Sequence, residues 1–383
     1  MFASSTYSQH GTLSGHCGAI YCMASTDDGK FFASGGKDGT RLWKLKSLTE
    51  ISPRPSPPGI RGPTTAIMWT NREDEPGEVL FYGTLAGYLV SWRQLTEQSG
   101  FQECYSRRLF GSSEILALAF DSLSNRLAAA SVGRVQLFSV ATASPLAIYS
   151  ITITNYIPKA LQFGTQRGNQ RDLLAFGRHD GKMRVCGPFP RTLTGNPTVD
   201  QEAGTWEIGA CIGDATIDSR KDTICVDDSD TGVRIYRIHD RHQVKLMHIP
   251  IVRENRPRQV RFGDDYRVVV VGSDHGIVYI FDRRTGQPVD QLKFEEEDFV
   301  QSIATLDCNG TALIFAARSG QALERNDIMI WRKAIVQPQP EPAVHRDIIG
   351  FFQYLIVVVL VIYVYQNSEL LEGYIRRSLQ GDY

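Results

Sequence analysis

The sequence repeats one pattern of short apolar runs and turns seven times along its length. The clearest unit is GHCGAIYCMASTDDGKFFASGGKDGTRLW, residues 15–43, in which Asp-Asp-Gly and Lys-Asp-Gly separate three runs. Asp-Gly pairs tolerate the positive φ that hairpin turns need, so the runs read as short antiparallel strands. The units end at residues that recur every 45 to 50 positions: Trp43, Trp92, Phe138, Cys186, Tyr236, Phe281 and Trp331. This period, with strand patterning and no long helical pattern between the units, predicts radially repeated β-sheets.

The Gly-His pair, the Asp-Gly turns and the terminal Trp of the first unit resemble the WD-repeat β-propeller family, and the other units support the resemblance by their period and strand outline. The resemblance implies an all-β fold of seven blades, which we assign to residues 1–335. In this family the N-terminal segment supplies the outermost strand of the last blade. Residues 6–16 stand where that strand is expected.

The resemblance also implies a hydrogen-bonded tetrad in the first blade. The matching residues are His16, Ser34, Asp38 and Trp43. Asp38 and Trp43 are five positions apart, whereas the family usually has six. A shift of one residue moves side chains to the opposite face of a strand. The first blade therefore has either a tighter turn or no tetrad.

Charge and cysteine usage exclude several classes of protein. The 41 Lys and Arg residues nearly balance the 42 Asp and Glu residues, so no global field attracts nucleic acid. The seven cysteines are scattered without a CxxC pair, which is typical of free thiols in a reducing compartment. The N-terminus has neither a basic leader nor an apolar core, so we expect no secretory signal.

The sequence contains no motif of the common enzyme classes: no GxSxG, no P-loop, no HExxH and no metal-spaced cluster of His or Cys. The eight histidines are dispersed. We therefore expect no enzymatic activity, no cofactor or metal, and no small-molecule substrate.

Residues 234–267 hold an excess of basic side chains. Within this region we single out a candidate patch for an anionic partner, formed by Arg253, Arg256, Arg258 and Arg261. Such a patch suits an acidic protein or anionic lipid headgroups. The alternative is that these residues are solvated on the faces and loops of the fifth and sixth blades.

The stretch IIGFFQYLIVVVLVIYVY, from Ile348 to Tyr365, contains no Asp, Glu, Lys, Arg or His. A proline-rich segment, which we take as a linker over residues 336–347, separates it from the last repeat. As a helix it would be about 27 Å long, which is near the thickness of an endoplasmic-reticulum bilayer. A buried strand is the alternative, but it would be about three times the usual strand length, and the ring of seven units has no vacancy for it. The sequence therefore predicts a transmembrane helix over 348–365.

A short tail, residues 366–383, follows the predicted helix. A span so close to the C-terminus, without a signal sequence, is the arrangement of tail-anchored proteins. We expect a single-pass protein of an intracellular membrane, the endoplasmic reticulum, with its propeller in the cytosol. The predicted function is a non-enzymatic scaffold for protein partners, whose identity the sequence does not reveal.

The sequence is compatible with two other functions. The order of propeller and span is similar to that of the endoplasmic-reticulum exchange factor that starts coat-protein-II vesicle budding, although the first repeat here is ordinary and lacks that family's glycine-rich ion-binding loop. The segment FDRR, residues 281–284, resembles a motif by which some WD-repeat proteins join cullin-type ubiquitin ligases. The alternatives are therefore a guanine-nucleotide exchange factor for a small GTPase and a ubiquitin-ligase substrate receptor.

Overall fold

A computed structural model of the protein describes the greater part of both compact units of the chain, Met1–Ile335 and Val336–Tyr383. The described residues are 5–53, 60–70, 77–94, 96, 100–140, 144–167, 170–186, 204–252, 256–320, 325–334, 344–367 and 375.

The described part of the first unit forms seven antiparallel sheets of four strands each. The inner strands of these blades are β2 (Ile20–Ser25), β6 (Thr64–Thr70), β10 (Ala117–Asp121), β14 (Pro158–Arg167), β18 (Ile212–Asp218), β22 (Val260–Gly263) and β26 (Ser302–Cys308). The second strands are β3 (Phe31–Gly36), β7 (Val79–Thr84), β11 (Arg126–Ser131), β15 (Gln170–Gly177), β19 (Thr223–Asp228), β23 (Val268–Val271) and β27 (Thr311–Ala317). The third strands are β4 (Gly39–Lys44), β8 (Tyr88–Gln94), β12 (Arg134–Ser139), β16 (Lys182–Val185), β20 (Gly232–Arg237), β24 (Ile277–Asp282) and β28 (Asn326–Ala334). The outermost strands are β5 (Thr49–Glu50), β9 (Phe101–Arg108), β13 (Leu146–Thr152), β17 (Thr205–Glu207), β21 (Gln243–Met247), β25 (Pro288–Lys293) and β1 (Ser8–His16). The seven predicted blades are thus confirmed.

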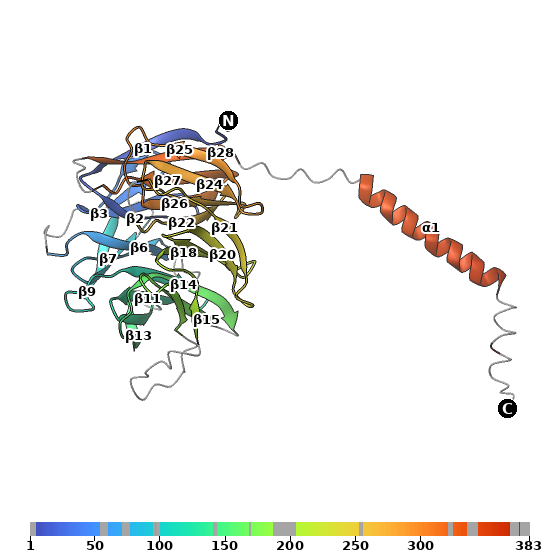
Figure 1. Ribbon diagram of the computed structural model, residues 1–383, viewed down its shortest axis with the longest axis horizontal. Coiled ribbons are helices and arrows are strands. Elements are labelled where there is room, and N and C mark those ends of the chain that lie inside the picture. Colours follow the sequence, from blue (N-terminus) through green and yellow to red (C-terminus); the bar gives the residue numbers. More distant parts are fainter. Residues whose placement is uncertain are drawn as a thin grey trace, which may run out of the picture. The chain divides into compact units, whose positions relative to one another are not determined.

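The inner strands form a closed ring, because each packs against the inner strands of both neighbouring blades and β26 packs against β2. The ring closes through the N-terminal strand as well. β1 pairs with β28, from Ser8 opposite Arg332 to His16 opposite Asn326, and completes the last blade (Figure 1). The prediction that the N-terminal segment supplies this outermost strand is confirmed.

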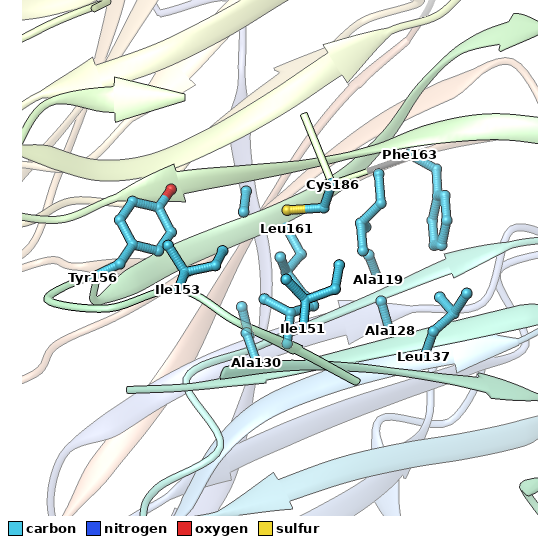
Figure 2. Close-up of a cluster of buried hydrophobic side chains, with 14 residues drawn as sticks. Ala119, Ala128, Ala130, Leu137, Ile151, Ile153, Tyr156, Leu161, Phe163 and Cys186 are labelled. Carbon is cyan, nitrogen blue, oxygen red and sulfur yellow. The ribbon is translucent and has the colours of Figure 1, made fainter. Parts of the chain in front are cut away.

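The core lies between the blades rather than within any one of them. Figure 2 shows the cluster between the third and fourth blades, where Ala128 and Leu137 face Leu161 and Phe163. Cys186, which ends the fourth unit where an aromatic residue is expected, is buried in this cluster. Burial of each large apolar side chain contributes roughly 1.5–3 kcal/mol. Apolar burial between blades therefore holds the repeats that lack the polar residues of the first.

The second unit contains the helix α1 (Val344–Gln366), which covers the predicted range 348–365 and begins four residues earlier. Its described side chains begin at Gln353, and those from Tyr354 to Tyr365 are all apolar or aromatic. In the described part of the chain, no helix is long and apolar enough to cross a membrane. The predicted helix is present, but the predicted membrane span is not supported. Most of the predicted linker and tail lies outside the described residues.

Candidate functional site

The four side chains of the predicted tetrad come together in the first blade. His16 Nδ1 lies 2.6 Å from Asp38 Oδ1, and His16 Nε2 lies 2.7 Å from Ser34 Oγ. Trp43 Nε1 donates to the same hydroxyl at 2.8 Å. Burial acts to raise the pKa of Asp38, but His16, together with the hydrogen bonds from the Cys17 N–H and Arg41, outweighs it and lowers this pKa to about 2. Since His16 ends β1, the tetrad ties the last blade to the first, which is a structural role.

A tight turn accounts for the short interval after Asp38. Gly36 pairs with Gly39, so Lys37 and Asp38 alone form the turn between β3 and β4. Gly39 has a φ of 106°, a backbone conformation that residues with a side chain rarely adopt. Of the two alternatives left open by the sequence, the structure contains the tighter turn.

The arginines of the predicted anionic-partner patch do not form one exposed surface. Arg258 is 5% exposed, and its Nη2 lies 2.8 Å from Asp227 Oδ1. Arg261 forms an ion pair with Asp214. Because both carboxylates belong to the fifth blade and both arginines to the sixth, these charges are compensated between blades. The prediction is corrected for these two residues.

The other two arginines of that patch are Arg256 and Arg253. The guanidinium of Arg256 lies 3.9 Å from the ring centroid of Phe299. Arg253 lies outside the described residues.

Arg283, in the segment FDRR, is also used inside the propeller. Its Nη1 lies 2.6 Å from Asp218 Oδ2, and its guanidinium lies 4.6 Å from the ring centroid of Phe262. The side chain is 11% exposed. This arginine joins the fifth and sixth blades, so little of it is left to contact a ubiquitin ligase.

A cavity of about 260 Å³ opens where the inner strands begin. Every blade contributes one residue to it at the same position of the repeat: Tyr21, Thr65, Leu116, Lys159, Gly213, Gln259 and Gln301. The residue before each of these is buried, so the chain alternates from the core to the cavity within one step. The cavity is therefore one mouth of the central channel, and we call it the channel mouth.

β-bulges lie at four of these positions and turn three side chains, those of Tyr21, Thr65 and Lys159, toward the channel mouth. The pairing of inner with second strands skips one residue in four blades, at Tyr21, Thr65, Lys159 and Gly213. A bulge sets two residues against one and re-aims a side chain. The repeated bulge explains why residues within a strand point into the channel mouth.

The turns after the second strands add further residues to the channel mouth, among them Leu85, Arg178 and Ser319. The backbone N–H of Arg178 donates to Ile157 O at 2.9 Å, and its carbonyl accepts from Ile212 N at 3.0 Å. The backbone of Arg178 is thereby held between the fourth and fifth blades.

Hydrogen bonds close one side of the channel mouth. Gln259 Nε2 donates to Tyr21 O at 3.2 Å, which links the sixth blade to the first. Gln301 Nε2 donates to Pro257 O, and Ser319 Oγ donates to Gln301 Oε1, each at 2.8 Å. On this side, the side chains of Gln259, Gln301 and Ser319 have hydrogen-bond partners in each other or in the backbone.

The opposite side carries charges without ion pairs. Within the described residues, neither Lys159 nor Arg178 has a carboxylate at ion-pair distance, and Arg178 Nε is buried without a hydrogen-bond partner. Burial raises the pKa of Glu114, against the opposing charges of Lys159 and Arg178. Tyr21 and Leu85, which line the same cavity, are 41% and 47% exposed. The channel mouth thus offers two cations and an apolar rim to a binding partner.

The channel mouth is not among the sites predicted from the sequence, although the repeat contains a signal for it. When the seven units are aligned on their inner strands, Lys159 is the one charged residue among the seven positions that line the channel. Arg178 has no such signal, because its role depends on where a turn ends. Among the described residues, no group of His, Cys, Asp or Glu is placed to hold a metal ion.

Comparison with known proteins agrees with this architecture. Residues 7–44 match the family model of the WD domain, G-beta repeat, which spans β1 to β4. The chain folds as a seven-bladed β-propeller, and its residues 7–44 match a WD40 repeat. Among solved structures it is similar to the WD40 β-propeller domain of Doa1, with a TM-score of 0.63 and 14% identity over 88% of this chain and 98% of that one. At this identity the similarity shows the fold alone. No curated protein matches the sequence.

Proposed function

We propose that this chain is a non-enzymatic scaffold that binds protein partners on the propeller face around the channel mouth. WD40 propellers usually serve as non-catalytic scaffolds. The observation that carries the proposal is the exposure of Tyr21 and Leu85 at the channel mouth, which Lys159 and Arg178 also line. Apolar anchors next to cations, on a rigid support, are typical of protein-interaction surfaces.

We further propose that α1 tethers the scaffold to an intracellular membrane, the endoplasmic reticulum, with the propeller in the cytosol. Residues 348–365 contain no Asp, Glu, Lys, Arg or His. The side chains from Tyr354 to Tyr365 are all apolar or aromatic and all exposed. A helix that is apolar on every side is stable when protein or lipid covers it. As a helix, residues 348–365 would be about 27 Å long, which is close to the thickness of a bilayer's hydrocarbon core. A membrane therefore suits this helix as its cover.

Proximity labelling from the full chain tests the scaffold function. We expect that some partners labelled by the full chain are also labelled by a chain truncated at Pro338. These shared partners bind the propeller. Leu85→Asp should remove those partners because it places a charge on the apolar rim. Leu146→Asp is the matched control, since Leu146 is 69% exposed on β13, away from the channel mouth. Partners that survive Leu85→Asp unchanged would exclude this face.

Carbonate extraction tests the tether. The full chain should stay with the membrane pellet, and the chain truncated at Pro338 should become soluble. A full chain that is released by carbonate would refute the anchor and leave the scaffold function standing.

A further inference from the structure

Three arginine and lysine side chains line the channel mouth, but they differ in how their charges are compensated. Arg258 is neutralised by Asp227. Lys159 and Arg178 have no ion pair within the described residues. A partly buried cation without a partner favours an anion that supplies charge-assisted hydrogen bonds. The ligand that this site selects is therefore negatively charged.

The size of the cavity limits what this anion belongs to. Pockets for small molecules and cofactors hold about 300–1,000 Å³. The channel mouth, at about 260 Å³, is smaller and is open at the rim. It suits one side chain that enters from a longer molecule. Tyr21, Pro63 and Leu85 line the cavity where the residues next to that side chain would lie.

The charges around the cavity also decide between classes of macromolecule. Nucleic acid presents a run of phosphates, which requires many cations along a groove. Here two cations stand beside the carboxyl of Glu114. This local arrangement matches a single anionic group with apolar neighbours, as in a protein segment.

We propose that the channel mouth binds an acidic side chain from an extended segment of a partner protein, held by Lys159 and Arg178. This inference rests on the proposed scaffold function and names the chemistry of its partner. Arg178 supplies a planar guanidinium for a carboxylate, and Lys159 supplies a second charge from the bulge of β14. The apolar rim contacts the residues on either side of the acidic one.

The test uses the full chain in mild detergent and three fluorescein-labelled peptides, Ser-Ala-Leu-X-Leu-Ala-Ser, in which X is Glu, Gln or Lys. Fluorescence anisotropy at low ionic strength measures their affinities. The Glu peptide should bind about tenfold more tightly than the other two, as expected for hydrogen bonds between charged groups. Lys159→Gln and Arg178→Gln should each abolish this preference. Glu114→Gln should strengthen it, because a competing carboxyl is removed.

Lys37→Gln is the matched control. Lys37 follows the second strand of the first blade, and its N–H donates to Ala19 O as the N–H of Arg178 donates to Ile157 O. It is exposed and does not line the cavity. This variant should keep the preference for the Glu peptide. Thermal unfolding of each variant verifies that the propeller is intact.

Several results would overturn the inference. The first is equal affinity for the three peptides. The second is a loss of the Glu preference in Lys37→Gln as large as in Arg178→Gln. The third is a concentration-dependent dimer of the chain that Arg178→Gln dissociates. The last result would make a second copy the occupant. If Leu85→Asp removes labelled partners while the Glu preference is absent, the scaffold function stands and this inference alone fails.

Discussion

Arg258, in the segment that leads into β22, and Asp227, on β19, form an ion pair inside the propeller. Arg258 Nη2 lies 2.8 Å from Asp227 Oδ1, and the backbone N–H of Arg258 donates to Asp227 Oδ2 at 2.9 Å. Neither side chain is more than 5% exposed. The pair fastens the sixth blade to the fifth and holds one wall of the channel mouth.

Replacing Asp227 with Ala should lower the free energy of unfolding by about 3–5 kcal/mol at neutral pH, because Arg258 would stay buried without a counter-charge. Chemical denaturation followed by tryptophan fluorescence measures the loss. Lys30→Gln is the control, since its ion pair with Asp28 is exposed and should contribute less than about 1 kcal/mol. Similar losses in the two variants would contradict a structural role for the buried pair.

The same carboxyl should make stability depend on pH. Burial raises the pKa of Asp227 to about 6, in spite of the charge of Arg258, from an ordinary value of 3.8. Between these values the folded state holds more protons than the unfolded chain, so this group's contribution falls as pH rises through the window. The expected loss is at most about 3 kcal/mol. Asp227→Asn should lack this component when unfolding is measured from pH 4 to pH 7, and parallel curves for the two proteins would refute it.

Ser34→Ala should destabilise the first blade. The Ser34 hydroxyl is hydrogen-bonded to both His16 Nε2 and Trp43 Nε1, so its loss leaves two buried polar groups unpaired. Each such group costs about 1–3 kcal/mol, and we expect a total loss of at least about 2 kcal/mol. Denaturation of Ser34→Ala beside Ser47→Ala, at an exposed serine, measures it. An unchanged midpoint in Ser34→Ala would mean that the tetrad does not stabilise the blade.

Leu13→Ala tests how strongly the N-terminal strand closes the ring. Leu13 is 1% exposed and packs with Ile328, Ile330 and Phe315 of the last blade. Removing such a side chain costs about 2–5 kcal/mol. Gln9→Ala, at an exposed position of the same strand, should change little. If Leu13→Ala unfolds like the control, the pairing of β1 with β28 contributes little to stability.

The blade count was predictable because it follows from local patterns, and the ring closure because the family resemblance implies it. Each unit repeats its turns and its apolar run, and the residues from Trp43 to Trp331 that end the units lie on or next to the third strands. The tetrad residues were also found, because a family motif marks them.

The charges that decide the candidate site were not predictable in the same way. Arg258 and Arg261 looked like part of a basic surface, but Asp227 and Asp214 reach them from another blade. These carboxylates lie 31 and 47 residues earlier in the chain. The sequence shows which charges are close along the chain, whereas compensation depends on which blades touch. For this reason the structure favours Lys159 and Arg178, rather than the arginines of the sixth blade, as the cations that bind a partner.

The pairing of β1 with β28 has a consequence for biosynthesis. At roughly 5–20 residues per second, translation takes tens of seconds to produce β28 after β1 has left the ribosome. An unpaired strand is an aggregation hazard during that time. β1, with the sequence SQHGTLSGH, has Leu13 as its one large apolar residue. The polar character of β1 therefore limits aggregation of the nascent chain until β28 is available to pair with it.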